Sequence, residues 1–474
     1  MFHSTVAEDA VTYRLDTPVA PEAEPVGTTA RAGLASFLGC VERLGVWRTL
    51  AQRVRLPMQE RCTGFTHLQK SQVLLAGLAA GCRRARDSDF TLAADPAAVA
   101  ALGLPRWPHS SQLTRHLRAF RPQHVAALRH ACEEILATHS RVRQRVRRAR
   151  RPGAPAVVID FDQTAISANG RTYPRTARGH FPKKGTRGYQ ASVAFAGDPS
   201  GGDDEVLAVF LDPGNAHASW RFADLLAALE RVLGPLGRLP GLVLRFDCQY
   251  ATADDLATLL RQGVRFVGRN YAAATAAAWA RDLGPDAPWV ELSPVKWVGD
   301  LGPGPVAPSR PDVVCRRLLV RSTGARQHLG YTAIVTSIPA DELAAVDLEP
   351  FYEGRQTIEG WLSEATAALQ LKGLWSRSFE GIEAFLLHVA LASNLLNWWE
   401  RRELLPDSGL PHLGLRQVIG RVITLPARVV RTTAGRLVLL LPPTHPYARR
   451  LVPPASAWQL PLPFDHAMLC DAHF

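Results

Sequence analysis

Carboxylate side chains in the stretch "AVVIDFDQTAI", residues 156–166, are of a type and spacing that could do chemistry. An apolar run predicts a strand that leads to Asp160 and Asp162, and Thr164 follows two residues further on. Two unrelated chemistries use such a motif. In a phosphatase, Asp160 would attack phosphorus and Asp162 would be the acid and base, whereas in a metal-dependent nuclease one of the two would bind metal.

A further aspartate, Asp247 in "VLRFDCQ", also follows a predicted strand. Because the ends of neighbouring strands open into one cleft, Asp162 and Asp247 are expected to meet there. Two carboxylates offer too few oxygen atoms to hold two divalent ions, so a third acid is needed. The best candidate is Glu359 in "YEGRQTIE".

A tyrosine and an arginine accompany this glutamate. Tyr352, Arg355 and Glu359 have the spacing i, i+3, i+7, which predicts that they share one face of a single helix. On such a face the glutamate could bind metal, while the arginine and the tyrosine hold a phosphate group. The three acids together indicate two-metal phosphoryl transfer.

The elements that must position these side chains are predicted from hydrophobic periodicity. Residues 1–30 lack periodicity and are expected to form a loosely ordered lead-in. Residues 31–150 have helical periodicity, which predicts an all-helical domain. It ends in "RVRQRVRRARRPG", residues 141–153, which is either a solvated helix end or a helix that contacts phosphates.

A shorter segment of this domain, "WPHSSQLTRHLRAFRP", could be a recognition helix. Ser110 and Ser111 are candidate N-caps, and Arg115, Arg118 and Arg121 recur at three-residue spacing. Such a helix either enters the major groove of DNA or only has one basic exposed face. The domain is therefore a candidate DNA-binding domain.

Beyond the Pro-Gly break the pattern changes to strands. Residues 151–271 are predicted to form an antiparallel meander of three strands, followed by helix, strand, helix and strand. This order is the topology of the ribonuclease-H-like fold, so the predicted class is α/β. Residues 272–350 are predicted to be a β-rich insertion, residues 351–400 the closing part of the catalytic core, and residues 401–474 a small C-terminal region for subunit or DNA contact.

Composition narrows the classes of partner. The net charge of +12 on 474 residues favours nucleic acid or another polyanion. Nearly all of that charge is arginine, which either suits phosphates and guanine edges or reflects GC-rich coding. The seven cysteines form no C-x-x-C pair, which argues for a reducing compartment and against structural zinc. We find no signal pattern or long apolar stretch, so we expect no membrane partner and a cytoplasmic location.

In these motifs the chain resembles the DDE transposases of bacterial insertion sequences, in the group with the signature Y-x2-R-x3-E-x6-K. Tyr352, Arg355 and Glu359 match the first three positions, whereas Thr366 stands at the lysine position and the nearest lysine is Lys372. Three further stretches resemble the insertion-sequence group numbered 1380, namely "LDPGNAHASW", "VLRFDCQYATADDLATLLRQGVRFVGRN" and "ARVVRTTAGRLVLLLPPTHPY".

The resemblance implies a Mg²⁺-dependent enzyme with two ions per active site, for which Mn²⁺ can substitute. Asp162, Asp247 and Glu359 would be the catalytic ligands. In this group the first ligand directly precedes a short polar stretch that contains threonine, which favours Asp162. Asp160 is left as a neighbouring carboxylate or as the alternative ligand, because side chains two apart on a strand share a face.

Phosphate and DNA contacts are implied at several other positions. Arg355 and Tyr352 would hold the scissile phosphate, and Lys372 would join them if the helix kinks or ends near Gly373. Tyr331 either stacks on a flipped base at the transposon end or is a buried strand tyrosine. A basic connection either contacts the DNA backbone or is an ordinary solvated loop; its candidate residues are Lys183, Lys184 and Arg187.

The implied function is transposition of double-stranded DNA. The enzyme would bind the inverted-repeat ends, cut them through a hairpin intermediate and join them to target DNA, at least as a homodimer because two ends are cut in one complex. It would work in the cytoplasm, at the nucleoid.

Two rival functions compete with this prediction. A haloacid-dehalogenase-type phosphatase needs parallel strands after its first motif and leaves Asp247 and Glu359 unused. A domesticated transposase would bind DNA without transposition, but then nothing would require all three acids.

Overall fold

The computed structural model describes residues 11–15, 24–57, 64–95, 99, 104, 106–149, 156–197, 204–270, 273–284, 288–323, 329–431 and 437–451. The chain is a mixed α/β protein that divides into two compact units. One, here called the helical unit, comprises Met1–Ile135, Ala168–Arg175 and Ser363–Phe474. The other, here called the sheet unit, comprises Leu136–Ser167 and Thr176–Leu362.

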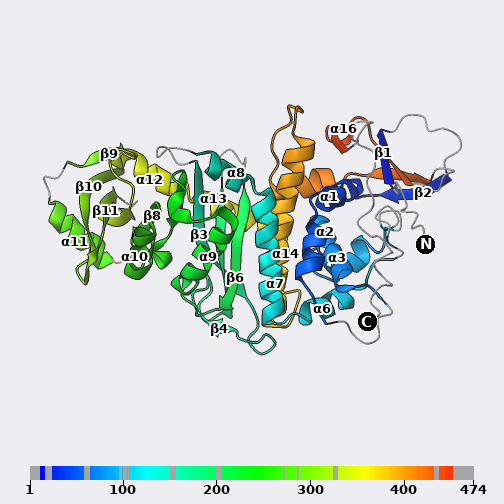
Figure 1. Cartoon of the computed structure of the whole chain (residues 1–474), viewed down its shortest axis with the longest axis horizontal. Helices are drawn as coiled ribbons and strands as arrows, with labels where there is room; N and C mark the ends of the chain where they lie inside the picture. The colour runs from blue at the N-terminus through cyan, green and yellow to red at the C-terminus, as the bar shows by residue number, and fades with distance from the viewer. Residues whose placement is uncertain are drawn as a thin grey trace. The chain divides into compact units, whose positions relative to one another are not determined.

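The centre of the sheet unit is a five-strand arrangement in the order β6, β5, β3, β7, β8. Figure 1 labels β6, β3 and β8 of these strands. The first three strands in sequence, β3, β5 and β6, pair antiparallel, which confirms the predicted meander. β7 pairs parallel with β3, and β8 pairs parallel with β7. The strand bounds are Val157–Ser167 for β3, Arg187–Ala196 for β5, Glu205–Pro213 for β6, Leu242–Phe246 for β7 and Phe266–Asn270 for β8. A short β4, Ala177–Arg178, also pairs with β5. The Gly/Asp turn of the meander, residues 198–203, lies outside the described residues.

Helices alternate with the later strands of this arrangement. α9, Phe222–Leu233, lies between β6 and β7, and α10, Ala253–Gln262, lies between β7 and β8. The arginine-rich segment forms α8, Arg141–Arg148, whose Val142 and Val146 are buried. The valines recur at i and i+4, so one apolar stripe holds a helix that is otherwise arginine and glutamine. Short 3-10 turns complete the connections: η1, Ala218–Arg221; η2, Leu236–Arg238; and η3, Cys248–Tyr250.

Residues 272–350 extend the same sheet rather than forming a separate one. Antiparallel strands β12, β11, β10 and β9 follow β8 in that order, which gives a sheet of ten strands. The bounds are Val290–Ser293 for β9, Lys296–Ala307 for β10, Arg310–Thr323 for β11 and Leu329–Thr336 for β12. Two helices, α11 (Ala273–Leu283) and α12 (Ala345–Glu353), accompany them.

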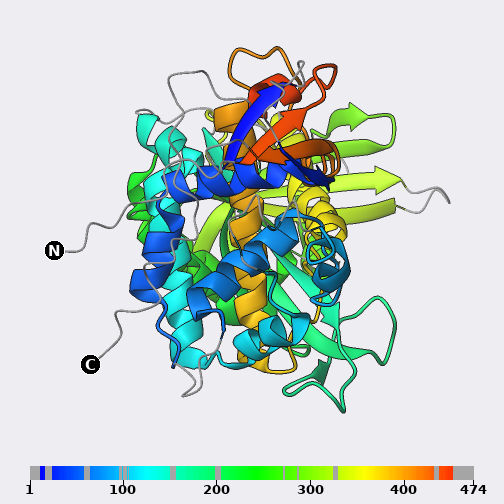
Figure 2. The same cartoon turned by 90° about the vertical axis from the view of Figure 1, so that its right-hand side faces the viewer.

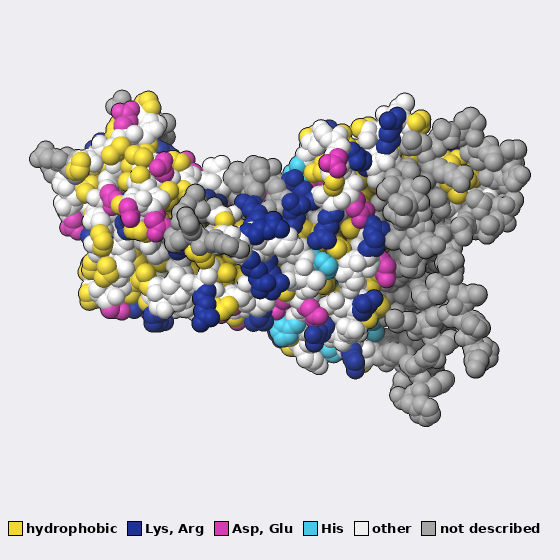
Figure 3. Space-filling view, turned by 45° about the horizontal axis from the view of Figure 1, so that its top comes forward, with side chains coloured by type: hydrophobic (Ala, Val, Ile, Leu, Met, Phe, Trp, Pro, Cys, Tyr) yellow, Lys and Arg dark blue, Asp and Glu magenta, His cyan; other side chains and the backbone are white. Residues whose placement is uncertain are grey.

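Acidic and hydrophobic side chains gather on the part of the sheet unit that carries β9, β10 and α12, at the left end of Figure 3. Val290, Val295 and Val346 are exposed there. Lys296 pairs with Glu349 at 2.9 Å and with Glu353. The positive charge of this lysine is therefore compensated, and this face does not favour a polyanion.

The helical unit is built around α14, Phe379–Trp399, which is buried along nearly its whole length. The pattern predicted that residues 351–400 close the catalytic core, but the chain from Ser363 onward belongs to the helical unit. The reason is that α14 is apolar all round and packs against α1, α3 and α6. Its other helices are α1 (Ala32–Arg43), α2 (Val46–Arg53), α3 (His67–Ala79), α4 (Asp87–Thr91), α6 (Ser110–Arg118), most of α7 (Pro122–His139), the end of α13 (Gln356–Ala368), η4 (Glu400–Leu404), α15 (Leu415–Gln417), η5 (Val418–Ile423) and α16 (Ala448–Leu451).

One helical stretch among the described residues, Phe379–Leu404, is long and apolar enough to cross a membrane. Some 89% of its most apolar window is buried inside the protein, so its length and composition are accounted for by its place in the core.

The serine caps predicted for α6 are wrong. His109 is the N-cap, its ring nitrogen accepts from the Ser111 amide at 3.2 Å, and Gln112 completes a capping box. Ser110 is instead held by Asp89, which accepts from its amide at 2.8 Å and from its hydroxyl at 2.6 Å. The chain therefore enters the helix one residue earlier than the serines indicate.

A four-stranded sheet joins the two ends of the chain in the helical unit. Its order is β1, β14, β13, β2, and Figure 2 shows the blue N-terminal strands beside the red C-terminal ones. The bounds are Val11–Leu15 for β1, Glu24–Thr29 for β2, Ala427–Arg431 for β13 and Leu437–Leu441 for β14. The lead-in predicted to be loosely ordered thus contains two strands, because the C-terminal strands provide partners that no local pattern reveals. The turn between β13 and β14 lies outside the described residues.

Candidate active site

Two aspartates stand side by side in the centre of the large sheet. The register of β3 and β7 pairs Phe161 with Phe246, so Asp162 and Asp247 follow on neighbouring strands. Each carboxylate is fixed locally. Asp162 accepts from the amide of Gln163 at 2.8 Å, and Asp247 caps η3 by accepting from the amide of Gln249 at 3.0 Å. The pairing of β3 with β7 therefore brings together the two acids that the sequence predicted. The prediction that both stand at strand ends is wrong for Asp162, because β3 continues through pairing with β5 to Ser167.

The helix predicted to carry Tyr352, Arg355 and Glu359 is interrupted. α12 ends at Glu353 and α13 begins at Gln356, so the prediction of one continuous helical face is wrong. The break lies at Gly354, where a Cβ atom would stand 2.6 Å from Nη1 of Arg245. This close approach leaves no room for a side chain, and the turn re-aims the residues that follow.

Arg355 nevertheless reaches the carboxylates. Its Nη2 lies 2.8 Å from Oδ1 of Asp162, and its Nη1 lies 3.4 Å from Oε1 of Glu359. The guanidinium therefore bridges an acid on β3 and an acid on α13. Its Nε is buried and has no hydrogen-bond partner among the described residues. A buried donor without a partner is costly, which makes this atom a candidate contact for an anionic ligand.

Asp160 and Asp162 lie on the same strand in different surroundings. Asp160 is fully buried, and its two oxygens accept from Nε and Nη2 of Arg245 at 2.6 and 2.9 Å. Thr357 donates a third hydrogen bond to it at 3.2 Å. Arg245 also donates to the carbonyl of Phe351 at the end of α12. The pair thus clamps the segment around the helix break to the sheet.

Sequence reasoning missed Arg245 and Thr357. The available signal was the single arginine inside the apolar strand "LVLRF", because a charge in the middle of a buried strand needs a buried partner. His217, the N-cap of η1, was missed as well. Its charge is near enough to lower the pKa of Asp247, and it stands in the "LDPGNAHASW" stretch.

Burial and charge act in opposite directions on these acids. Burial raises the pKa of Asp162 to about 6; Arg355 lowers it, while the charges of Asp247 and Glu359 raise it further. Burial likewise raises the pKa of Asp247, and Arg355 is the largest opposing influence. The carboxyl group of Asp162 therefore senses the charges of both other acids, and the three form a concentrated negative site that a cation would stabilise.

The donor set fits a hard divalent cation in its chemistry, since all three candidates are carboxylates. No group of three or more His, Cys, Asp and Glu side chains within the described ranges is close enough to hold an ion as it stands. The guanidinium of Arg355 bridges Asp162 and Glu359, so these two carboxylates already share one positive charge.

Tyr352 lies near this centre, whereas Lys372 belongs to the other unit. Burial raises the pKa of Tyr352 to about 12, and the neighbouring charges that act on it include Arg355 and Asp247. α13 ends at Ala368, so Lys372 stands on the loop beyond it, exposed and within the helical unit. Thr366, at the lysine position of the signature, is half-buried on α13.

The basic connection and Tyr331 lie at the surface of the sheet unit. Tyr331 on β12 is 37% exposed, which removes the alternative of a buried strand tyrosine. Its ring is 6.4 Å from that of Trp289, and Arg321 lies 4.6 Å from Trp289 and 4.7 Å from Trp297. Among the described residues, no hydrogen bond or ion pair joins the basic connection to the three candidate carboxylates. Its residues Lys183, Lys184 and Arg187 are exposed.

The comparisons with known proteins place this geometry in a family. The sequence matches the family described as "Transposase DDE domain group 1" over residues 27–457, which is most of the chain. A search of curated proteins finds no match. Among solved structures, the chain is similar to a piggyBac transposase synaptic complex with hairpin DNA, with 10% identity and a TM-score of 0.45 over 85% of this chain and 82% of that one. Because the family match spans both units, the chain belongs to the DDE transposases of domain group 1.

Proposed function

We propose that this DDE transposase cuts the inverted-repeat ends of an insertion sequence and joins them to target DNA, using two Mg²⁺ or Mn²⁺ ions held by Asp162, Asp247 and Glu359. The observation that carries the proposal is that Arg355 lies between Asp162 and Glu359, while the charges of Asp247 and Glu359 both raise the pKa of Asp162. The family uses divalent metal ions, and a site made only of carboxylates is of the kind that Mg²⁺ prefers.

Bound ions would activate the attacking hydroxyl and stabilise the leaving oxygen of the scissile phosphate. The protein's own residues would do the rest. Arg355 presents a buried Nε without a partner among the described residues, suited to a phosphate oxygen. Tyr352, whose pKa burial raises to about 12, carries its proton at neutral pH as an ordinary tyrosine does, so its hydroxyl can donate to another phosphate oxygen.

We infer a ribonuclease-H-like core for the sheet unit. The support is the strand order β6, β5, β3, β7, β8 with its three antiparallel and two parallel members, together with the place of Asp162 and Asp247 on the first and fourth strands. In such a core the closing helix brings the last acid back to the sheet, as α13 does with Glu359.

The remaining steps rest on the resemblance to hairpin-forming members of the family. We infer a hairpin intermediate in which the exposed ring of Tyr331 stacks on a flipped base, and a homodimer in which two ends are cut together. Lys183, Lys184 and Arg187 are exposed and free of carboxylate contacts among the described residues, which suits backbone contact. The work would be done at the nucleoid in the cytoplasm.

A cleavage assay tests the function. The full chain is incubated with Mg²⁺ or Mn²⁺ and a plasmid that carries the inverted repeats flanking its reading frame. We expect nicks at the repeat ends, and a loss of more than about a hundredfold in rate for Asp247→Asn, since even residues that only orient metal ligands are worth ten- to a hundredfold. Asp341→Asn is the charge-matched control, because Asp341 is exposed in the same unit.

Two results would contradict the proposal. Binding of the ends without any cleavage by the unaltered chain would indicate a domesticated protein. Hydrolysis of a small phosphate ester that Asp160→Asn abolishes and Glu359→Gln preserves would indicate a phosphatase. The second outcome is opposed by the complete burial of Asp160 against Arg245, which leaves no path for a substrate to its oxygens.

A further inference from the structure

A cationic cavity of about 680 Å³ lies within the helical unit. All of its lining residues belong to that unit, and none of the three candidate metal ligands lines it. It is lined by the connection between α3 and α4, by α6, and by the loop after α13. Six of its lining side chains are basic and none is acidic; the basic ones are Arg83, Arg84, Arg86, Arg118, Lys372 and Arg377.

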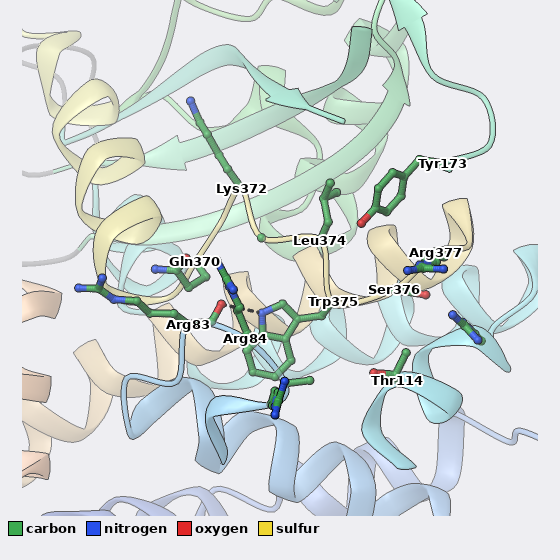
Figure 4. A pocket seen from close by; sticks show the side chains of 14 residues that line it. Arg83, Arg84, Thr114, Tyr173, Gln370, Lys372, Leu374, Trp375, Ser376 and Arg377 are labelled. Atoms are coloured by element: carbon green, nitrogen blue, oxygen red, sulfur yellow. Dashed lines mark hydrogen bonds between the residues drawn. The ribbon is translucent and has the colours of Figure 1, made fainter. Parts of the chain in front are cut away.

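These cations surround an aromatic floor. Figure 4 shows Arg83 and Arg84 on one side of Trp375 and Arg377 on the other, with Lys372 extending above the loop. All six basic side chains belong to exposed residues. The charges therefore stand along the rim of the cavity, where an extended ligand could contact several of them at once.

The floor is held rigidly. Nε1 of Trp375 donates to the carbonyl of Arg83 at 3.1 Å, and its ring stacks on Phe385 of α14 with centroids 5.1 Å apart. Gln370 begins the loop in the left-handed conformation, with φ of 57°, and its amide group donates to the carbonyls of Thr366 and Ala367. The backbone that carries Lys372 and Arg377 is thus tied to the backbone that carries Arg83, so the points from which these side chains extend are held together.

The six cations lack compensation. No carboxylate of a described residue forms an ion pair with any of them, whereas Arg129 and Arg175 of the same unit pair with Glu383 and Glu380. The nearest acid on the same connection, Asp87, accepts from the backbone amides of Arg83 and Arg84 at 2.9 Å instead of pairing with a rim side chain. Like charges gathered in this way repel one another, and an anion relieves the repulsion.

We propose that this cavity binds consecutive backbone phosphates of a DNA strand and so fixes the position of the DNA on the helical unit. The inference rests on the proposed function. Six cations on both sides of the floor exceed what a single phosphate needs, and arginine forks suit phosphodiester oxygens. Lys372 is thereby assigned a phosphate contact in this cavity.

The test measures the salt dependence of DNA binding by fluorescence anisotropy with a short labelled duplex of arbitrary sequence. Each phosphate contact contributes about 0.9 to the slope of log K against log salt. For Lys372→Gln with Arg377→Gln we expect the slope to fall by about 1 to 2 and the Kd to rise roughly tenfold at low salt. Lys372→Arg with Arg377→Lys, which keeps both charges, should retain most of the binding and shows that the loop still folds.

The matched control removes the same charge elsewhere in the helical unit. Arg416→Gln with Arg421→Gln changes two exposed arginines, on α15 and η5, for which the described residues provide no acidic partner. Equal loss of slope in both double variants would overturn the proposal, because it would reflect only the net charge. Displacement of the duplex by low concentrations of inorganic pyrophosphate, in a manner that requires Lys372 and Arg377, would also overturn it by indicating a site for a small anion.

The two proposals fail in different ways. If the unaltered chain cuts its ends and the cavity variants bind DNA as the control does, the cavity assignment is wrong and the function stands. If the unaltered chain neither binds nor cuts DNA, both are wrong.

Discussion

Asp160 and Asp162 show how two identical residues on one strand are separated by their surroundings. The sequence places both on one face, but only the structure reveals that Arg245 and Thr357 engage Asp160 completely. Asp162 meets Arg355, Asp247 and Glu359 instead. Alternation along a strand is a local property, whereas the choice of partner depends on a neighbouring strand and a distant helix.

This difference predicts opposite consequences for substitution of each aspartate by asparagine. Asp160→Asn should leave the buried Arg245 charge unpaired and lower the free energy of unfolding by about 3 to 5 kcal/mol. Asp162→Asn should abolish cleavage while the fold persists. Denaturant unfolding and end cleavage are measured on both variants. Unchanged stability in Asp160→Asn, together with lost cleavage, would show that Asp160 is the ligand instead.

The raised pKa of Asp162 predicts a pH dependence. Its pKa is about 6 in the folded protein and 3.8 as the ordinary value, so the carboxyl group becomes protonated as the pH falls through about 6. A protonated acid is a poor metal ligand. We expect the cleavage rate at limiting Mg²⁺ to fall by up to about tenfold per pH unit below about 6.

The same shift has a consequence for stability. In the metal-free protein, the contribution of Asp162 to stability is fully present below 3.8 and is lost as the pH rises through about 6, because the charged form is buried. Mg²⁺ should therefore raise the melting temperature more at neutral pH than at about pH 5. Equal increases at both pH values, or a flat rate profile, would contradict the assignment.

At the scale of elements, the break between α12 and α13 was not predicted, because the sequence around it has the spacing of a single helix. The spacing of Tyr352, Arg355 and Glu359 was correct for one helix, and the residues do gather, but they do so across a turn. Gly354 was the available signal. Its role depends on Arg245, which lies on a strand more than a hundred positions away in sequence, so periodicity alone could not reveal it.

The role of the break between α12 and α13 can be tested by substituting alanine at two glycines. Gly354→Ala would place a Cβ atom 2.6 Å from Arg245 and disturb both the pair with Asp160 and the aim of Arg355. We expect cleavage to fall at least about tenfold, as misplacement of a catalytic group by an ångström does. Gly360→Ala is the matched control on α13, where no atom stands within 4 Å of the added Cβ.

The control should be neutral or stabilising by up to about 1 kcal/mol, because alanine favours a helix over glycine. Cleavage rate and thermal unfolding are measured for both variants, with DNA binding as a separate readout. Equal activity of Gly354→Ala and Gly360→Ala would mean that the turn does not aim Arg355.

At the scale of the whole molecule, the meander and the apolar runs that lead to Asp162 and Asp247 could be predicted because they are local in sequence, although β3 continues past Asp162 to Ser167. The four-stranded sheet could not, since β1 pairs with β14 across almost the entire chain. The grouping of α14 with the N-terminal helices was missed for a similar reason. The apolar pattern of residues 379–399 predicts that this helix is buried. It does not predict which elements pack against the helix, because an apolar surface fits any apolar partner.

Each unit has its own buried core, so each should unfold in its own transition. Calorimetry should show Mg²⁺ shifting only the transition of the sheet unit, since the candidate ligands all lie there.

A charge buried in the small sheet should lower only the transition of the helical unit. Val429→Asp places such a charge on β13, between β14 and β2, and should lower that transition by an amount equivalent to about 3 kcal/mol or more. Arg431→Gln, an exposed change on the same strand, is the control. A single transition that moves as a whole with both Mg²⁺ and Val429→Asp would show that the helical unit and the sheet unit unfold together, because a stabilising effect on one would then be transmitted in full to the other.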